Sequence, residues 1–342
     1  MYQARVRATV LRASLNGHKM RENRREVNTN MLLAGDIGGT KTLLGLFDPA
    51  PARPKVVCSR AFPTLEYRDL NAIISEFTQE GAAKGASIEA ACFGVAGAVM
   101  GDSARLTNVP WLVEAPRVAA TFGIRRAALL NDLQAMAYGV PALQPSELHV
   151  LQEGEAIRGG HMAVVAAGTG LGEAFLHCVD GRFVPAPSEA GHADFAPRTE
   201  REIALWRDLI TRFGRAEVEH VVSGRGLVNV HRAAHAGGPC AVVADESDPN
   251  LQAKMTRAGL EGRCPGCIEA LDMFVEAYGA EAGNLALRTM STGGLFVGGG
   301  IAPKVLPALT DGRFIRAFRA KAPFEAMLTR IPVKVILNQE VA

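Results

Sequence analysis

The sequence contains no long apolar run: nowhere does it approach the ~18–20 consecutive apolar residues that a membrane-spanning helix requires. A surplus of one charge is also missing, because 37 Lys and Arg stand against 35 Asp and Glu. The net charge of +2 divides into +5 for residues 1–30 and −3 for the other 312 residues. The body of the chain therefore lacks the basic excess of nucleic-acid-binding proteins, and we expect neither a nucleic acid nor a membrane as partner.

Residues 1–30 have no apolar core, which excludes a secretory signal peptide. Their Arg-rich, acid-poor composition also fits a transit peptide, but Met31 directly precedes the first apolar run. We therefore interpret residues 1–30 as a disordered basic leader that results from an overlong start, and we expect it to be dispensable.

Cysteine is sparse and scattered, which is typical of a reduced, cytoplasmic protein. The cysteines are Cys58, Cys92, Cys178, Cys240, Cys264 and Cys267. Cys264-Pro-Gly-Cys267 forms a CxxC motif, which could be a redox pair or half of a zinc site. The sequence shows no second pair and no His beside it, and the flanks indicate a loop entering a helix. We therefore expect two thiols without a special role.

The chain of 342 residues is long enough for two domains, and its 36 glycines suit the many turns of an α/β protein. Apolar runs predict strands at 32–48, 55–62, 90–96, 127–130, 148–151, 162–167, from 295, and at 331–337. Helical patterns cover 68–84, 133–139, 199–213, 225–235, 248–260 and 267–288. A polar, proline-containing stretch at 141–147 marks the expected boundary between a small lobe, 31–141, and a large lobe, 142–336.

The most informative pattern is a pair of glycine-rich turns between apolar runs, Asp36-Ile-Gly-Gly-Thr-Lys and Ala167-Gly-Thr-Gly-Leu-Gly. Each predicts a strand–turn–strand hairpin. Glycine lets the backbone approach a ligand closely, and successive N–H groups can bind an anion. Ordinary hairpins are one alternative. A Walker P-loop is another, but that motif needs Gly where Thr40 stands, and a strand follows instead of a helix. The pair predicts two similar lobes that hold one polyphosphate between them.

Polar residues follow other apolar runs. Asn131 and Asp132 lie where a strand passes into a helix, so Asp132 could act as a general base or cap the helix. Glu189 and His192 are close in sequence and could accept hydrogen bonds from vicinal sugar hydroxyls. A metal site and a solvated loop are the alternatives for this cluster. Glu219, before a further glycine turn, is a weaker candidate.

Taken together, six ordered motifs between residue 32 and about residue 340 resemble the bacterial glucokinase family, specifically the ATP-dependent, proteobacterial type. They are Asp36-Ile-Gly-Gly-Thr-Lys, Leu130-Asn-Asp, Ala167-Gly-Thr-Gly-Leu-Gly, Glu189-Ala-Gly-His-Ala-Asp-Phe, Ser223-Gly-Arg-Gly-Leu and Gly294-Leu-Phe-Val-Gly-Gly-Gly-Ile. The resemblance implies an α/β, two-lobed fold of the actin/hexokinase/Hsp70 (ribonuclease H-like) type with a central cleft. The Cys- and His-based zinc motif of a related repressor/kinase group is missing here.

The resemblance also implies roles for individual residues. Asp132 would take the proton from the sugar 6-hydroxyl, and Asp36 would orient Mg²⁺ through water. The other sugar hydroxyls would be bound by Asn131, Glu189, His192, Glu219 and, with a weaker match, Asn108. The phosphates would be held by Gly38, Gly39, Thr40, Gly168, Thr169, Gly170 and Gly172. The adenosine would lie against Gly298, Gly299 and Gly300.

We therefore predict a cytoplasmic glucokinase that uses ATP and Mg²⁺ to convert glucose to glucose 6-phosphate, and a homodimer is compatible with the resemblance. A kinase for fructose, mannose or an amino sugar, a non-catalytic sugar sensor and a chaperone-like ATPase are the alternatives, and the donor could be ADP or polyphosphate. Family members continue past the final strand with a Gly-Leu-Leu-Gly segment and a helix, whereas this sequence stops at Ala342. We expect residues 337–342 to begin that return to the small lobe, and the missing helix to expose apolar surface.

Overall fold

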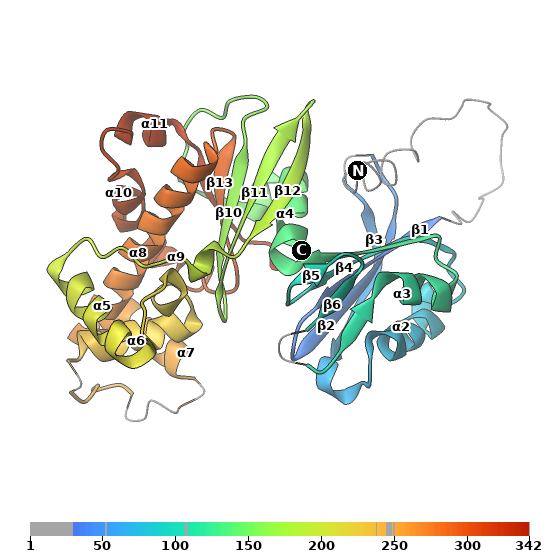
Figure 1. Cartoon of the computed structure of the whole chain (residues 1–342), viewed down its shortest axis with the longest axis horizontal. Helices are drawn as coiled ribbons and strands as arrows, with labels where there is room; N and C mark the ends of the chain where they lie inside the picture. The colour runs from blue at the N-terminus through green and yellow to red at the C-terminus, as the bar shows by residue number, and fades with distance from the viewer. Residues whose placement is uncertain are drawn as a thin grey trace. The chain divides into compact units, whose positions relative to one another are not determined.

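The computed structural model describes residues 30–51, 53–106, 109–236, 238–243, 248 and 250–341. The predicted leader, apart from Asn30, and the candidate sugar ligand Asn108 lie outside these residues. The chain forms two compact units, Met1–Ala135 and Met136–Ala342 (Figure 1). Among the described helices, none combines the length and the apolar character needed to cross a membrane.

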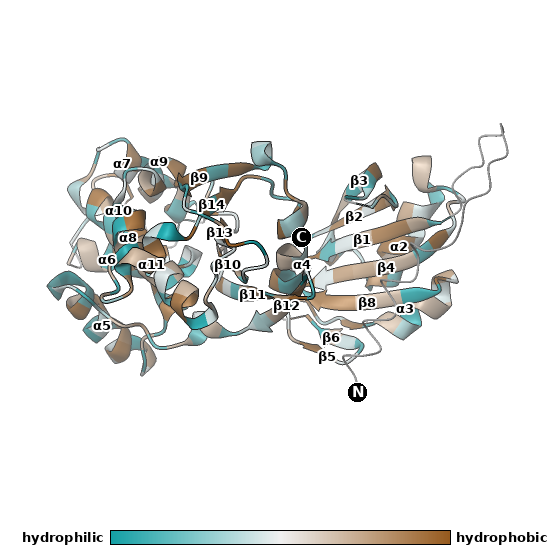
Figure 2. Ribbon diagram, turned by 90° about the horizontal axis from the view of Figure 1, so that it is seen from above, coloured by the Kyte–Doolittle hydropathy of each residue, from teal (hydrophilic) through white to brown (hydrophobic). Residues whose placement is uncertain are grey.

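The first unit is built on a five-stranded sheet in the order β3-β2-β1-β4-β8. Its strands are β1 (Met31–Ile37), β2 (Lys41–Asp48), β3 (Lys55–Pro63), β4 (Ile88–Val95) and β8 (Arg126–Asn131). β2 is antiparallel to β1 and β3, whereas β4 is parallel to β1 and β8. Apolar residues run along β1, β4 and β8 (Figure 2), as expected for parallel strands that are covered on both faces.

Two helices and a small sheet complete this unit. Helix α2 (Leu70–Gln79) is capped by Asp69, whose carboxylate accepts a hydrogen bond from the Ala72 amide, and it buries one apolar face. Helix α3 is Ala115–Phe122, and the small sheet consists of β5 (Val99–Met100), β6 (Ser103–Arg105) and β7 (Leu112–Glu114). The predicted helix at 68–84 is too long, because Glu80 is extended and a short 3-10 turn, Gly81–Ala83, follows.

The second unit contains a six-stranded sheet in the order β12-β11-β10-β13-β14-β9. Its strands are β9 (Leu148–Gln152), β10 (Met162–Ala167), β11 (Leu171–Val179), β12 (Arg182–Ser188), β13 (Gly294–Gly298) and β14 (Val333–Ile336). The strand pairings of β10–β14 repeat those of the first unit: an antiparallel hairpin and third strand on one side, two parallel strands on the other. The sequence did not predict β12, whose prolines are tolerated because it is an edge strand.

Helix α8 is the core of the second unit. The helices are α5 (Glu200–Phe213), α6 (Gly224–Ala234), α7 (Leu251–Leu260), α8 (Pro265–Thr289), α9 (Leu306–Leu309), α10 (Arg313–Arg319) and α11 (Glu325–Arg330). Helix α8 packs on β10 and β13 and against α6, α7 and α10 (Figure 1). Gly279 is required on α8, because a Cβ atom there would lie 2.2 Å from the carbonyl oxygen of Phe314 on α10.

Helix α4 (Asp132–Gly139) continues from the end of β8 and spans the division between the units. Between α4 and β9 the chain forms two short 3-10 turns, Val140–Ala142 and Pro145–Glu147. They overlap the stretch 141–147, where the sequence predicted a polar connection.

A buried acidic pair lies beneath the second hairpin. Glu173 on β11 is fully buried. Glu281 on α8 accepts hydrogen bonds from Asn284 and Arg288 at 2.9 and 2.6 Å. Burial, with the nearby charge of Glu281, raises the pKa of Glu173 from its usual 4.5 to about 8. The pair therefore holds a proton on Glu173 at neutral pH.

This proton makes stability depend on pH. The folded state keeps the proton up to about pH 8, whereas the unfolded state releases it above its usual pKa of 4.5. The stability that Glu173 contributes therefore falls as the pH rises between these values, by an amount on the order of a few kcal/mol. Glu173→Gln keeps the shape and removes the titration, so we expect it to unfold at a higher temperature than wild type at about pH 8.5 but not at about pH 5.

Thermal unfolding followed by fluorescence across this pH range measures the effect. Glu153→Gln, at an exposed position, is the matched control and should follow the wild-type curve. Parallel wild-type and Glu173→Gln curves would contradict the buried proton.

Candidate functional site

In the first unit, the predicted acidic residues gather at one edge of the sheet. Asp36 on β1 pairs with Gly94 on β4, which in turn pairs with Leu130 on β8. Because these three strands are parallel, their carboxyl ends meet at one edge, where open α/β sheets bind ligands. Asp36 and Asp132 therefore belong to one polar surface of this unit.

The two carboxylates influence each other. Burial raises the pKa of Asp36, the charge of Asp132 raises it further, and Lys41 opposes the shift. A pair of partly desolvated carboxylates that repel each other is an arrangement that a bound cation would stabilise. The edge has the donor chemistry for a hard divalent ion such as Mg²⁺.

The alternative role of Asn131 and Asp132 as helix caps is also visible. The Leu133 amide donates hydrogen bonds to Asn131 Oδ1 at 2.9 Å and to Asp132 Oδ1 at 2.8 Å. Asn131 Nδ2 donates to the Gly97 carbonyl at 3.4 Å. These bonds fix both side chains at the start of α4, and a fixed carboxylate is compatible with catalysis as well as with capping.

The first glycine turn is held by two threonines. The Gly38 amide donates to the Lys41 carbonyl at 3.0 Å, which closes the turn. Thr64 Oγ1 donates to the Gly38 carbonyl at 2.9 Å and lies 2.9 Å from Thr42 Oγ1. Both threonines are completely buried. Thr64 was not predicted, because it follows β3 and carries no motif of its own.

The second glycine turn is held from two sides. The Gly168 amide donates to the Gly170 carbonyl at 2.8 Å, and the Gly168 carbonyl accepts from the Gly224 amide at the start of α6. The Leu171 amide donates to Glu219 Oε2 at 2.8 Å. Glu219, expected to bind a sugar hydroxyl, thus also supports this turn directly.

The third glycine turn, Gly298–Gly300 after β13, lies against the second. Gly299 has φ +82°, and a Cβ atom there would lie 2.3 Å from the Ala167 carbonyl oxygen, so only glycine fits. The Ile301 amide donates to the same carbonyl at 3.2 Å. The candidate phosphate turn after β10 and the candidate adenosine turn after β13 are therefore neighbours.

One buried side chain joins these two strand ends. Tyr278 on α8 is fully buried, and its hydroxyl accepts a hydrogen bond from the Ala167 amide at 3.1 Å. The same hydroxyl lies 3.2 Å from the Val165 and Gly298 carbonyls, to which it can donate. Burial raises the pKa of Tyr278, so this hydroxyl stays protonated. Sequence reasoning missed Tyr278, which sits inside an ordinary apolar helix pattern.

The structure places one further acidic residue, Glu217, in the predicted sugar cluster. The chain after Ala190–His192 pairs with the segment before Val218–His220, through an isolated bridge between Asp194 and Glu217. His192 Nδ1 lies 3.2 Å from Glu217 Oε1, and a donor atom of each of His192, Glu217 and Glu219 falls within 4.8 Å of the others. The hydrogen bond to Glu217 raises the pKa of His192.

Glu217 was missed because it follows an unremarkable helix end, whereas Glu189 and His192 stand in a recognisable run. Glu189 itself is exposed, and its carbonyl accepts from the His192 amide at 3.0 Å. This cluster adjoins the second glycine turn through Glu219, whose carboxylate binds the Leu171 amide.

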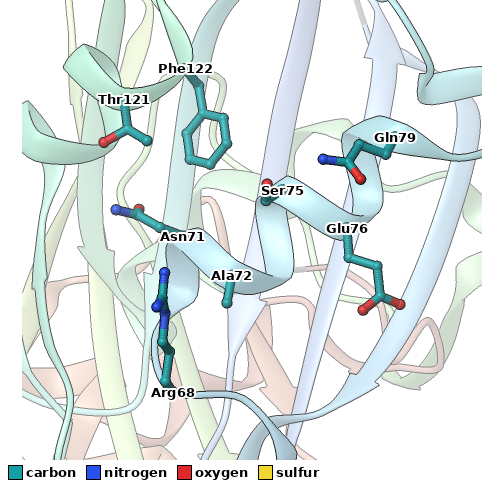
Figure 3. A pocket seen from close by; sticks show the side chains of 8 residues that line it. All are labelled: Arg68, Asn71, Ala72, Ser75, Glu76, Gln79, Thr121 and Phe122. Carbon is teal, nitrogen blue, oxygen red and sulfur yellow. The ribbon is translucent and has the colours of Figure 1, made fainter.

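A separate surface groove lies between α2 and the end of α3 (Figure 3). Its lining residues are Arg68, Asn71, Ala72, Ser75, Glu76, Gln79, Thr121 and Phe122. None of the predicted site residues lines it, and Glu76 already binds Arg60 and Tyr67. The groove is therefore not the candidate site.

Comparison with known proteins is consistent across sequence and structure. The glucokinase family model matches residues 33–342. The chain is 37% identical over 329 residues to the glucokinase of Nostoc punctiforme, covering 91% of this chain and 96% of that one. It is 36% identical over 312 residues to the glucokinase of Rhizobium meliloti, covering 90% and 88%.

Among solved structures, the crystal structure of glucokinase from an Antarctic psychrotroph matches with a TM-score of 0.81 and 27% identity, over 91% of this chain and 95% of that one. These findings confirm the resemblance drawn from the six motifs and the predicted α/β fold class.

Proposed function

The chain belongs to the glucokinase family, and on that premise we propose that it transfers the γ-phosphate of ATP to the 6-hydroxyl of D-glucose, giving glucose 6-phosphate. One observation carries the proposal. In the second unit, a cluster of imidazole and carboxylate groups that can accept hydrogen bonds adjoins a glycine-rich turn, since Glu219 belongs to the cluster and also holds the turn. A sugar kinase must bind a hydroxyl-rich acceptor beside a polyphosphate, and a simple ATPase has no need of the cluster.

Asp132 is proposed as the general base. Phosphoryl transfer asks the protein for positioning and charge stabilisation, with little covalent chemistry. A carboxylate fixed at the start of α4 would accept the proton of the sugar 6-hydroxyl while the oxygen of that hydroxyl attacks the γ-phosphorus. The ADP oxygen leaves with the electron pair of the broken P–O bond.

The glycine turns are proposed to bind the donor. Within the turns Gly38–Thr40 and Gly168–Gly172, the backbone N–H groups other than those of Gly38, Gly168 and Leu171, which donate within the protein, would offset phosphate charge. The turn Gly298–Gly300 would lie against the adenosine. The contact of this turn with the Ala167 carbonyl fits a nucleotide that runs from one turn to the next.

Mg²⁺ is proposed to be held near Asp36, through water. The raised pKa of Asp36 beside Asp132 fits a cation there. When bound, the ion would neutralise charge on the transferred phosphate. The chain's own part is to hold the Asp36 carboxylate close to the charge of Asp132, so that their combined negative charge would attract the hydrated cation.

Asn131, Glu189, His192 and Glu219 are proposed to bind the remaining sugar hydroxyls, and Asn108 keeps its predicted role. Glu217 would act through His192, which it orients by the 3.2 Å hydrogen bond. The homodimer and the cytoplasmic location stay predictions, which light scattering and cell fractionation would check.

Asp132→Asn tests the proposed base. An amide cannot accept the proton, so we expect kcat to fall by at least ~10²-fold while glucose binding is largely kept. Coupled steady-state assays and glucose titration by calorimetry measure the two effects. Asp102→Asn, on the exposed turn before β6, is the matched control. Near-normal turnover of Asp132→Asn would leave capping as the only role of this residue.

Glu189→Ala and His192→Ala test the sugar cluster. Each removes a hydrogen-bond partner of a hydroxyl, so each should weaken glucose binding by ~1–3 kcal/mol while ATP affinity changes little. Calorimetry with each ligand separates the two, and the exposed Glu261→Ala serves as control. Unchanged glucose affinity in both variants would rule the cluster out as the sugar site.

Tyr278→Phe tests the link between the two strand ends. Without the hydroxyl, the buried Ala167 amide loses its partner, which costs ~1–3 kcal/mol of unfolding free energy. Because both donor turns start at these strand ends, we expect the KM for ATP to rise more than the KM for glucose. Tyr67→Phe, which removes a hydroxyl bound to Glu76 in the first unit, is the control. Equal changes in both KM values would refute a specific role in the donor site.

A further inference from the structure

A cluster of sulfur and imidazole side chains lies where the chain after α6 approaches the start of α8; the two helices pack together (Figure 1). His231 lies in the last turn of α6 and His235 directly follows the helix. Cys240 stands in the segment that follows, Cys264 immediately precedes α8, and Cys267 lies in its first turn. Donor atoms of His231, His235, Cys240 and Cys267 all lie within 4.8 Å of one another.

This arrangement corrects the expectation of two thiols without a special role. The sequence shows no His beside the CxxC motif, because the partners come from residues 24–36 positions earlier. The packing of α6 against α8 brings them to it: His235 Nε2 is 3.3 Å from Cys264 Sγ.

Three distances between donor atoms match the edges of a metal-centred tetrahedron. Cys240 Sγ lies 3.6 Å from Cys267 Sγ and 3.9 Å from Cys264 Sγ. Tetrahedral zinc, with bonds of about 2.3 Å to sulfur and about 2.0–2.1 Å to nitrogen, requires edges of about 3.8 Å between sulfurs and about 3.6 Å between sulfur and nitrogen. The three measured edges, including the 3.3 Å edge from His235 to Cys264, fall within about 0.3 Å of these values.

The imidazole of His235 is oriented as a ligand. Its Nδ1 lies 2.8 Å from the His231 carbonyl oxygen, to which it can donate a proton. That bond leaves the lone pair on Nε2, the atom that faces Cys264. A hydrogen bond from the other ring nitrogen to a backbone carbonyl fixes the tautomer and ring orientation of metal-binding histidines. The ring of His231 packs 4.1 Å from that of His235 and supports this orientation.

The chemistry of the donor set selects the ion. Three thiolates and one imidazole form a soft set that suits zinc, and the Cys-x₂-Cys spacing at 264–267 is common in zinc sites. Cys264 and Cys267 are buried, so four protein ligands would enclose the ion and leave no position for a substrate. A disulfide would use two of the sulfurs and would not explain why a third thiol and an imidazole converge on them.

We propose that Cys240, Cys264, Cys267 and His235 bind one Zn²⁺ as a structural site that ties the segment after α6 to the start of α8. Cys264 takes the fourth position because its sulfur lies near both His235 Nε2 and Cys240 Sγ, whereas the His231 ring packs against that of His235. The site is independent of the proposed catalytic function. It would secure the first turn of the helix that carries Tyr278, and removal of the metal is expected to lower the thermal unfolding midpoint.

Metal analysis of the full chain tests the site. After purification without an affinity tag and dialysis, inductively coupled plasma mass spectrometry should find about one zinc per chain. Cys240→Ser and Cys267→Ser should each lose the zinc, whereas Cys178→Ser, a thiol outside the cluster, should retain it. Absence of zinc from the wild-type protein, even after incubation with Zn²⁺ under reducing conditions, would overturn the proposal.

A second measurement uses only the wild-type chain, in case the variants fail to fold. Zinc should protect Cys240, Cys264 and Cys267 from alkylation, and a strong chelator should expose all three, while Cys178 reacts equally in both conditions. Peptide mass mapping reads the result. Equal labelling with and without the chelator, or a Cys264–Cys267 disulfide in the freshly purified protein, would contradict a zinc site.

Discussion

The hydroxyl of Tyr278 is the contact on which the ligand-binding side of the second unit depends. This hydroxyl accepts a hydrogen bond from the Ala167 amide and lies within hydrogen-bonding distance of the Gly298 carbonyl. One side chain therefore fixes the ends of both β10 and β13. The hydroxyl can do this only because α8 is buried directly on these strands, where an unpaired polar group would be costly. The buried helix thus sets the positions from which two glycine-rich turns begin.

The two units meet different chemical demands. The second unit presents backbone amides on turns and a cluster of hydrogen-bonding side chains, with Glu219 common to both. The first unit presents two carboxylates, and their mutual repulsion favours a cation. Amides suit anionic phosphates, and carboxylates suit a metal ion and a proton. These are the requirements of phosphoryl transfer to an alcohol, where positioning and charge matter more than covalent chemistry.

The sequence predicted the elements whose signals are local. The glycine turns after β1 and β10 were recognisable because Gly and Thr interrupt apolar runs. Asp132 was recognisable because it lies where a predicted strand ends and a predicted helix begins. Contacts between distant segments could not be predicted in this way. Thr64 reaches Gly38 across 26 positions, Glu217 reaches His192 across 25, and Tyr278 reaches Ala167 across 111. The short strands β5, β6 and β7 were not predicted for another reason. Two or three residues are too few to show the alternation of apolar and polar residues that marks a strand.

Phosphorylation of the 6-hydroxyl of glucose is best checked by identifying the reaction products. Wild-type protein would be incubated with ATP, Mg²⁺ and glucose, and in parallel reactions with fructose, mannose or glucosamine in place of glucose. The sugar phosphates would be identified by ³¹P NMR, and the ADP formed would be quantified. We expect one glucose 6-phosphate for each ADP formed, with glucose the best acceptor. ADP release without a sugar phosphate, or a higher kcat/KM for another hexose, would contradict it.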